Sequence, residues 1–485
     1  MPIPKEILAV ERPKSTRVKK SGDRYLVIKR TSKRINGKNV PVELGTIGEI
    51  INGKYVEIRK EPRKKSKTID IKDYGLAKLF DDTCNNLLVD LSASFDLKVA
   101  KQLYLIALIR AIDNDIKNRD ISFSYETSFL SEMIPGIPLS ENTISSLLEK
   151  VGMEYRYIVD FLNKRVEKFS DSTQVIDGTL VDNNSTVNSF SEFSRKARTK
   201  GSKDLTLVYS FDIATKEPVA MKTYVGNMLD STSITDFLKS FKVKNKLMVL
   251  DKGFYTKENI KNFKENLNLS YIIPLKSSSK LIKENNAFKD INNHLKGYDD
   301  STILYNKIKV DDTTFLYAFK NIKTEYEQKL SYIKNQENKG LYDKDKFAGK
   351  DDSFGVIVFE TNIDLEPLEV YLAYTKRWEI ETMFQMMKGI IDLDTVNVHN
   401  DYRVIATEFI NFLSVIMAQK IKQRFKDTKI KSKSGSEKSL SEIYSYKQLI
   451  RYISKIKKVK VYDSNEWVRC ETVKYVKEIA EVLSI

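Results

Sequence analysis

The sequence predicts an α/β protein made of several domains. The chain has 485 residues, 41% of them apolar, which is enough to bury a large core without disulfides or metals. From about residue 173, strand-like and helix-like segments alternate. Residues 246–251 form a nearly continuous apolar run, which is typical of a buried strand. A helix-like segment and the strand-like residues 271–276 follow, so we expect a βαβ unit.

Composition argues against several classes of protein. Charged residues make up 31% of the chain. The longest apolar stretch, near residues 409–418, is shorter than the ~18 residues of a membrane span, so we expect no membrane association. The two cysteines, Cys84 and Cys470, are too far apart in the sequence for a disulfide framework or a zinc knuckle. No secretory signal is visible, so we expect a cytoplasmic protein.

Positive charge is concentrated in two arms. The net charge is +16, and residues 1–70 carry 19 Lys and Arg against 8 Asp and Glu. Residues 420–460 carry 14 basic residues against 3 acidic ones, so each arm is +11 and the remainder is −6. Such arms favour a polyanionic partner, most often a nucleic acid. The alternative is a lysine-rich composition with solvated lysine faces.

Changes in pattern divide the chain into successive segments. A basic β meander with turns at Asn36-Gly37 and Asn52-Gly53 is followed by a helical region that is either DNA-binding or purely structural. The two parts of the α/β core enclose a polar, β-containing insertion with a mobile linker at 334–352. Long helices are expected at 366–390, with Pro367 in the first turn, and at 402–425. The expected segments are 1–70 (meander), 71–168 (helical), 169–275 (core), 276–354 (insertion), 355–425 (core) and 426–485 (basic C-terminal region, beginning with a linker).

Candidate catalytic groups are carboxylates, because the sequence lacks the common nucleotide-binding, metalloprotease and nucleophile motifs and has only His294 and His399. Asp177 lies in an apolar strand, and Asp251 ends the strand at 246–251. Open α/β sheets place their active sites at such strand ends. A half-buried carboxylate needs a partner, and a divalent cation is one. Taken singly, each Asp could equally be a helix cap, a turn residue or half of a salt bridge.

A third carboxylate, Glu381, belongs to a polar stripe on the long helix. At 100° per residue, Tyr374, Arg377, Glu381 and Lys388 share an arc of about 60°. An i,i+4 salt bridge explains Arg377 with Glu381, but it does not explain the other two. The stripe suits a metal-binding acid beside groups that grip phosphates.

These residues resemble a known family. The spacing Tyr374-x2-Arg377-x3-Glu381-x6-Lys388 is similar to the Y-R-E-K signature of cut-and-paste DDE insertion-sequence transposases. The segments VIDGT around Asp177 and LDKGF around Asp251 resemble the first and second catalytic Asp motifs of that family. Gly226-Asn227 together with Asp230 resembles a further sequence element of this family. The resemblance covers about residues 173–425.

The resemblance implies a fold and a set of roles. It implies a ribonuclease H-like catalytic core interrupted by a β-containing insertion between Asp251 and Glu381. The gap of 130 residues between these two, against 74 between Asp177 and Asp251, leaves room for the expected insertion. Asp177, Asp251 and Glu381 would be catalytic and would hold two Mg²⁺ ions, for which Mn²⁺ could substitute. Tyr374, Arg377 and Lys388 would contact DNA.

The activity implied is that of an insertion-sequence transposase. Such an enzyme binds double-stranded DNA at terminal inverted repeats and catalyses metal-dependent cleavage and strand transfer into target DNA. We expect a homodimer in a synaptic complex, in the bacterial cytoplasm and associated with the nucleoid. The alternatives are a ribonuclease H-like DNA nuclease without strand transfer, an inactive DNA-binding relative, and an unrelated basic structural protein.

Overall fold

The structure is a computed structural model that falls into two units. One unit comprises Met1–Asp70 with Lys460–Glu466, and the other Ile71–Val459 with Trp467–Ile485. The expected turn at Asn36-Gly37 lies outside the described residues. The structure describes residues 2–35, 38–58, 69–113, 116–169, 172–185, 187–193, 202–228, 230–241, 243, 246–298, 302–389, 393, 395–431, 435–461 and 466–485.

The first unit contains the predicted meander. Its antiparallel sheet follows chain order β1-β2-β3-β4 and packs on a small core of Val18, Val27 and Ile50. Asn52 and Gly53 both have positive φ, 48° and 73°, as the expected tight turn between β3 and β4 requires. The elements of this unit are α1 (Lys5–Leu8), β1 (Thr16–Ser21), β2 (Arg24–Ile35), β3 (Lys38–Ile51) and β4 (Lys54–Glu57).

The second unit begins with helices, as the apolar periodicity predicts. Ser140 caps α6 as expected, because its hydroxyl accepts a hydrogen bond from the Thr143 N–H at 3.3 Å. Asp96 caps α3 in the same way through Val99. The helices are α2 (Gly75–Ser92), α3 (Leu97–Ile112), η1 (Asn118–Asp120), α4 (Ile121–Thr127), α5 (Leu130–Met133), α6 (Glu141–Met153) and α7 (Tyr155–Lys168).

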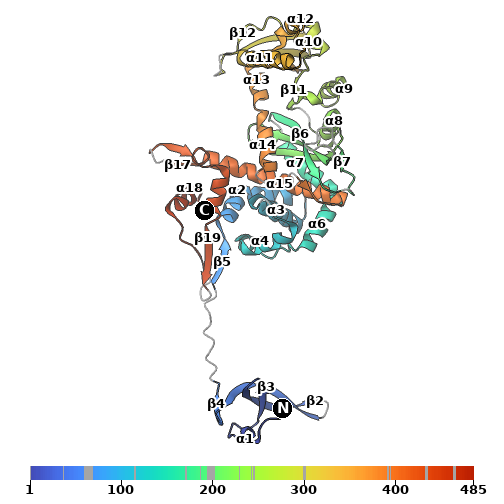
Figure 1. The fold of residues 1–485 in the computed structure, drawn as a ribbon. Coiled ribbons are helices and arrows are strands. Elements are labelled where there is room, and N and C mark those ends of the chain that lie inside the picture. Colours follow the sequence, from blue (N-terminus) through green and yellow to red (C-terminus); the bar gives the residue numbers. More distant parts are fainter. Residues whose placement is uncertain are drawn as a thin grey trace. The chain divides into compact units, whose positions relative to one another are not determined.

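A mixed sheet forms the centre of this unit (Figure 1). Its core strands have the order β9-β8-β6-β10-β11, in which β8 is antiparallel to both β6 and β9, while β10 and β11 run parallel to β6. This order and polarity are those of a ribonuclease H-like core, as predicted. The elements are β6 (Gln174–Asn183), β7 (Glu192–Phe193), β8 (Lys203–Asp212), β9 (Pro218–Val225), α8 (Asp230–Ser240), β10 (Leu247–Leu250), η2 (Lys252–Phe254), α9 (Lys257–Lys261), η3 (Asn262–Asn266), β11 (Ser270–Pro274) and β16 (Thr395–Val396).

The inserted segment extends the core sheet. Strand β15 pairs antiparallel with both β11 and β14, so the order continues as β12-β13-β14-β15-β11. The prediction of a mobile linker at 334–352 is wrong. Helices cover most of this range, and Phe347 packs on Tyr332 and Phe354 with ring centroids 5.9 and 5.7 Å away. The elements are α10 (Lys280–Glu284), β12 (Asn293–His294), β13 (Ile303–Asp311), β14 (Thr314–Asn321), α11 (Ile322–Asn338), α12 (Lys344–Ala348), η4 (Asp351–Ser353) and β15 (Val356–Thr361).

The long helix expected at 366–390 is two helices, α13 (Pro367–Thr375) and α14 (Trp378–Gly389). Between them the chain makes short-range hydrogen bonds. The Arg377 N–H donates to the Tyr374 carbonyl at 3.0 Å, and the Ile380 N–H donates to the Arg377 carbonyl at 3.1 Å. This tighter turn places Arg377 immediately before α14, with Glu381 in the first turn of that helix.

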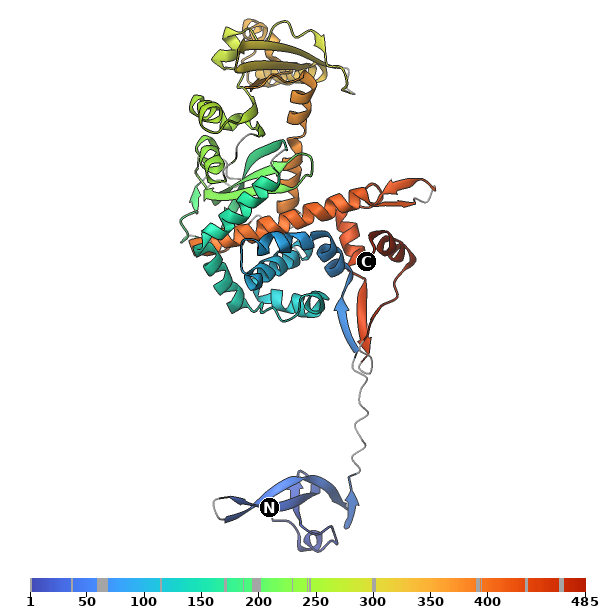
Figure 2. The same ribbon diagram turned by 180° about the vertical axis from the view of Figure 1, so that it is seen from behind.

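Helix α15 (Asp401–Asp427) runs between the N-terminal helices and the core sheet (Figures 1 and 2). It is long and apolar enough to cross a membrane, but 83% of its most apolar window is buried inside the protein. Packing of α15 against α6 is close. A Cβ on Gly152 would lie 1.9 Å from the Tyr402 carbonyl oxygen, so this crossing requires glycine.

The C-terminal region is more ordered than the predicted linker at 426–439. Strands β17 and β18 pair antiparallel within it, with Lys429 opposite Ser439. Strand β5, which precedes the helical region, lies at the edge of a sheet of order β20-β19-β5. The elements are β5 (Ile69–Asp73), β17 (Lys429–Lys431), β18 (Glu437–Ser439), α16 (Leu440–Ile443), α17 (Tyr446–Ile453), β19 (Lys457–Val461), β20 (Trp467–Arg469) and α18 (Lys474–Leu483).

A buried polar group links α15 to α3. Arg110 donates to the Asn411 side-chain oxygen at 2.9 Å, and the Asn411 amide donates to Glu408 at 3.3 Å. Glu408 is 1% exposed. Burial raises the pKa of Glu408 to about 7, against smaller lowering effects of Asn411 and Arg110.

Because of Glu408, the stability of the protein should decrease as pH rises. Because its pKa is higher in the folded than in the unfolded protein, the folded state binds more protons between about pH 4.5 and 7. The free energy of unfolding should therefore fall by up to roughly 3 kcal/mol as pH rises through this window. We expect Glu408→Gln to remove this component and to be more stable than wild type at pH 8. Urea unfolding at pH 5 and pH 8 measures the effect, and equal pH dependence in both proteins would contradict it.

Candidate active site

The register of two parallel strands brings the first two candidate carboxylates together. Ile176 of β6 lies opposite Leu250 of β10, so the next residues, Asp177 and Asp251, are neighbours. Asp177 remains within the central strand. Asp251 follows the end of β10, where its carboxylate accepts a hydrogen bond from the Gly253 N–H at 3.5 Å and begins η2. Strand pairing thus positions both acids.

Aromatic packing positions the third carboxylate. Phe384 of α14 packs edge-on against Tyr209 of β8, with centroids 5.7 Å apart. At the other end, Tyr374 of α13 packs on Phe359 of β15 at 4.5 Å. These contacts hold the α13–α14 junction over the sheet, and they bring Glu381 toward the two Asp residues.

Arg377 contacts all three acids. Its Nη1 lies 3.2 Å from Asp177 Oδ2 and 4.0 Å from Asp251 Oδ1, and its Nη2 lies 2.9 Å from Glu381 Oε1. The guanidinium side chain is 10% exposed, whereas the three acids are between 19% and 33% exposed. Within the described residues, the buried Arg377 Nε has no hydrogen-bond partner. The candidate site is therefore a cluster of three carboxylates around one cation.

The cluster shifts the pKa values of its members. Burial, with smaller contributions from Asp251 and Glu381, raises the pKa of Asp177 to about 6, against lowering by the Gly178 N–H and Arg377. Burial alone would lower the pKa of Arg377, but the nearby anionic groups, Asp177 foremost, raise it overall. Arg377 therefore stays charged beside the three carboxylates.

The two remaining stripe residues lie beside this cluster. Tyr374 is half-buried, and its ring centre lies 5.6 Å from the guanidinium carbon of Arg377. Lys388 lies further along α14, where its ammonium group donates to the Leu180 carbonyl of β6. It is also close enough to Asp204 to lower the pKa of that acid, which burial and Asp182 raise overall. Lys388 thus approaches β6 beyond the three carboxylates.

The donor set fits a hard divalent cation. Asp177, Asp251 and Glu381 supply only carboxylate oxygens, the ligands preferred by Mg²⁺ and Mn²⁺. Among the described residues, however, no three Asp, Glu, His or Cys groups are already arranged to hold a metal ion. In the candidate site the Arg377 guanidinium lies among the acids instead.

Close backbone contact explains the glycine of the Gly226-Asn227 element. A Cβ on Gly226 would lie 2.2 Å from the Asp204 carbonyl oxygen and 2.6 Å from that of Glu192. Any side chain would push the end of β9 away from β7 and β8. The Asp230 side chain lies outside the described residues. The role of Gly226 in the structure is therefore in packing.

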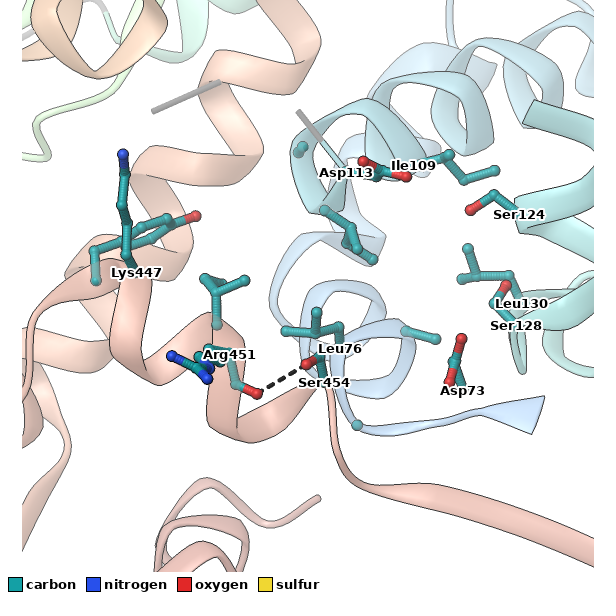
Figure 3. A pocket seen from close by; sticks show the side chains of 16 residues that line it. Asp73, Leu76, Ile109, Asp113, Ser124, Ser128, Leu130, Lys447, Arg451 and Ser454 are labelled. Carbon is teal, nitrogen blue, oxygen red and sulfur yellow. Dashed lines mark hydrogen bonds between the residues drawn. The ribbon is translucent and has the colours of Figure 1, made fainter. Parts of the chain in front are cut away.

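A separate cavity of about 550 Å³ lies among α2, α3, α4 and α17 (Figure 3). Apolar side chains such as Leu76 and Ile109 line it, with Lys447 and Arg451 contributed by α17. Neither Asp177, Asp251 nor Glu381 lines this cavity. It is therefore distinct from the carboxylate cluster.

The structure brings Asp177, Asp251 and Glu381, which the sequence predicts as site residues, together around Arg377, but the sequence did not indicate this contact of Arg377 with all three acids. The helical wheel pairs Arg377 with Glu381. It carries no information on Asp177, which is 200 positions away in the chain. Sequence reasoning also did not single out Trp378, whose side chain is 62% exposed next to Arg377. The sequence signal that could have drawn attention to Trp378 is its position directly after Arg377.

Comparison with known proteins establishes the class. The family model described as "Transposase DDE domain" matches residues 168–417, which is more than half of the chain. The chain therefore belongs to this family, and it is a DNA transposase of the DDE type. The matched range contains Asp177, Asp251, Glu381 and both parts of the core sheet.

Among solved structures, the chain is similar to one described as "Cryo-EM structure of piggyBac transposase synaptic complex with hairpin DNA (SNHP)". The TM-score is 0.40 and the identity 13%, with 78% of each chain covered. No curated protein matches the chain in a sequence search.

Tyr374 should contribute to stability through its ring. We expect Tyr374→Ala to lower the free energy of unfolding by about 2 kcal/mol, because it removes the contacts with Phe359 and Arg377. Tyr374→Phe keeps the ring and should unfold at the wild-type temperature. Thermal unfolding of both variants tests this, and an Ala variant as stable as wild type would show that the ring contact is not needed.

Proposed function

We propose that this protein is the transposase of an insertion sequence, which binds terminal inverted repeats and catalyses cut-and-paste transposition. The observation that carries the proposal is the convergence of Asp177, Asp251 and Glu381 on a single guanidinium, within the domain matched by the transposase family. Three acids at one point repel one another. A purely structural role would be served by separate salt bridges, so the convergence favours a functional role.

The three carboxylates are the proposed ligands of two Mg²⁺ ions, with Mn²⁺ as a substitute. Bound there, these ions supply Lewis-acid activation of the attacking oxygen and stabilisation of the leaving oxygen in phosphodiester cleavage and strand transfer. The strands β6 and β10 hold Asp177 and Asp251 rigidly. Glu381 comes from α14, so the position of this helix decides whether the set is complete.

The two cations and the phenol on α13, on α14 and in the turn between them are proposed to position the DNA end. Arg377 offers a planar fork that matches a phosphate, and Lys388 offers a point charge further along β6. Tyr374 lies next to Arg377, and its ring limits the directions in which the guanidinium can move. These residues would hold the scissile phosphate against the carboxylates.

The basic arms and the helical region are proposed to bind the terminal repeats. Phosphate contacts by lysine and arginine give affinity and register, whatever the base sequence. Two ends must be held for transposition, so we propose a homodimer that forms a synaptic complex and also engages target DNA. A bacterial, nucleoid-associated location in the cytoplasm follows from this role.

Loss of one carboxylate should abolish DNA cleavage. A plasmid carrying the gene with its native flanks is incubated with purified protein and Mg²⁺, and the products are separated on neutral and denaturing gels. We expect wild type to excise the element, and Asp251→Asn to lose activity by at least about a thousandfold while still binding DNA. Asp312→Asn is a matched control, because this side chain is 94% exposed and pairs only locally with Lys309.

The other outcomes of this assay discriminate between the alternatives. Binding without cleavage by wild type would indicate an inactive DNA-binding relative. Cleavage at many sites, without joined products, would indicate a plain nuclease. Cleavage that is unchanged in Asp251→Asn would contradict the proposed site itself.

The N-terminal meander should contribute to the salt dependence of DNA binding. Lys29 and Lys33 are exposed on β2. If both contact phosphates, replacing them with Ala should flatten the plot of log K against log salt by about 1.8, or 0.9 per contact. The control replaces Lys334 and Lys339 on and next to α11, which should leave the slope unchanged. Titrations of labelled duplex at several salt concentrations measure both, and equal slopes would exclude the meander as a phosphate-binding surface.

A further inference from the structure

The arrangement of Arg377 presents a conflict with metal binding. The guanidinium engages Asp177 Oδ2 and Glu381 Oε1, and it also approaches Asp251 Oδ1. These oxygens belong to the three carboxylates that are proposed to hold the divalent ions. A cation that entered the same space would also be repelled by the positive charge of Arg377. The guanidinium and the metal ions therefore compete for one set of ligands.

The need for a resident cation follows from charge and burial. Asp177 lies on the central strand with its side chain only 19% exposed, and Asp251 and Glu381 place two further acidic groups around the same guanidinium. A single guanidinium offsets part of this negative charge in the protein without metal. Two divalent ions would offset more of it, so the three acids no longer need Arg377 once metal is bound.

The position of Arg377 allows its side chain to change conformation. It lies in the tight turn between α13 and α14, so rotation of its side chain need not disturb either helix. Its Nε is buried and has no hydrogen-bond partner in the described part of the chain, so the observed position leaves one donor unsatisfied. A position on a phosphate oxygen could satisfy that donor.

We propose that Arg377 is an exchangeable counter-cation of the active site. It neutralises the three carboxylates until divalent ions displace it, and the released guanidinium then binds a phosphate of the DNA end. This inference rests on the proposed function of the site. It makes metal binding and DNA binding mutually reinforcing, because each removes Arg377 from a position that opposes the other. The protein would load metal poorly away from DNA.

The test measures Mn²⁺ affinity of the full-length protein without DNA, with free Mn²⁺ quantified by electron paramagnetic resonance. We expect Arg377→Gln to bind Mn²⁺ about tenfold more tightly than wild type, because the competing cation is gone. Lys216→Gln is the matched control. Lys216 forms an ion pair at 2.5 Å with Glu379, which lies on α14 together with Glu381. Lys216 forms no ion pair with the three acids, so this variant should bind Mn²⁺ like wild type.

A second variant covers the case in which Arg377→Gln does not fold. Arg377→Lys keeps the positive charge but cannot bridge three acids with a planar fork. We expect its Mn²⁺ affinity to be about threefold higher than that of wild type. Equal or weaker affinity in the folded variants would overturn the counter-cation role.

A DNA arm tests the coupling. Adding a duplex that carries the element's end should raise the Mn²⁺ affinity of wild type by a larger factor than that of Arg377→Gln. Equal factors would overturn the coupling. If none of the proteins binds Mn²⁺ with or without DNA, the proposed metal site fails as well. That result is distinct from Mn²⁺ binding that does not respond to Arg377.

Discussion

Mutual repulsion among three carboxylates is the constraint around which the centre of this protein is built. Asp177 and Asp251 are fixed side by side by the register of β6 and β10, and Glu381 is brought to them from α14. Like charges at such close range need a cation between them. Arg377 provides that cation, with distances of 2.9 to 4.0 Å to the three acids. The three acids thus share one of the protein's own positive charges.

The insertion is connected to the carboxylate cluster through β15. Strand β15 closes the inserted segment and pairs with β11 of the core, and its Phe359 supports Tyr374 at the end of α13. On the opposite side of β15, Val358 belongs to a second apolar cluster with Leu316 and Leu275. Helix α13, which leads into the turn before α14 and Glu381, therefore packs on a strand whose stability depends on the insertion. Changes far from the acids can shift the third carboxylate by this route.

Most of the site could be predicted from the sequence, because catalytic spacing and helix periodicity are local properties. The stripe of Tyr374, Arg377, Glu381 and Lys388 was predicted from the angle per residue of one continuous helix, whereas the structure divides these residues between α13, the turn and α14. The break between α13 and α14 was missed because Lys376 and Arg377 are ordinary helix formers, and tertiary contacts decide the turn. The helices in 334–352 were missed because they depend on an aromatic cluster around Phe347 rather than on periodicity.

The continuity of the sheet also determines when the site can form. Strands β11 and β15 are neighbours in space, but the whole insertion separates them in the chain. Closing such a long loop is slow unless the intervening segment has already collapsed into its hairpin of β13 and β14. Asp177 and Asp251 are carried in and directly after neighbouring parallel strands, whereas Glu381 follows β15 in the chain and is synthesised after both. During synthesis, the two acids on the sheet therefore exist for a time without the third carboxylate and without Arg377 between them.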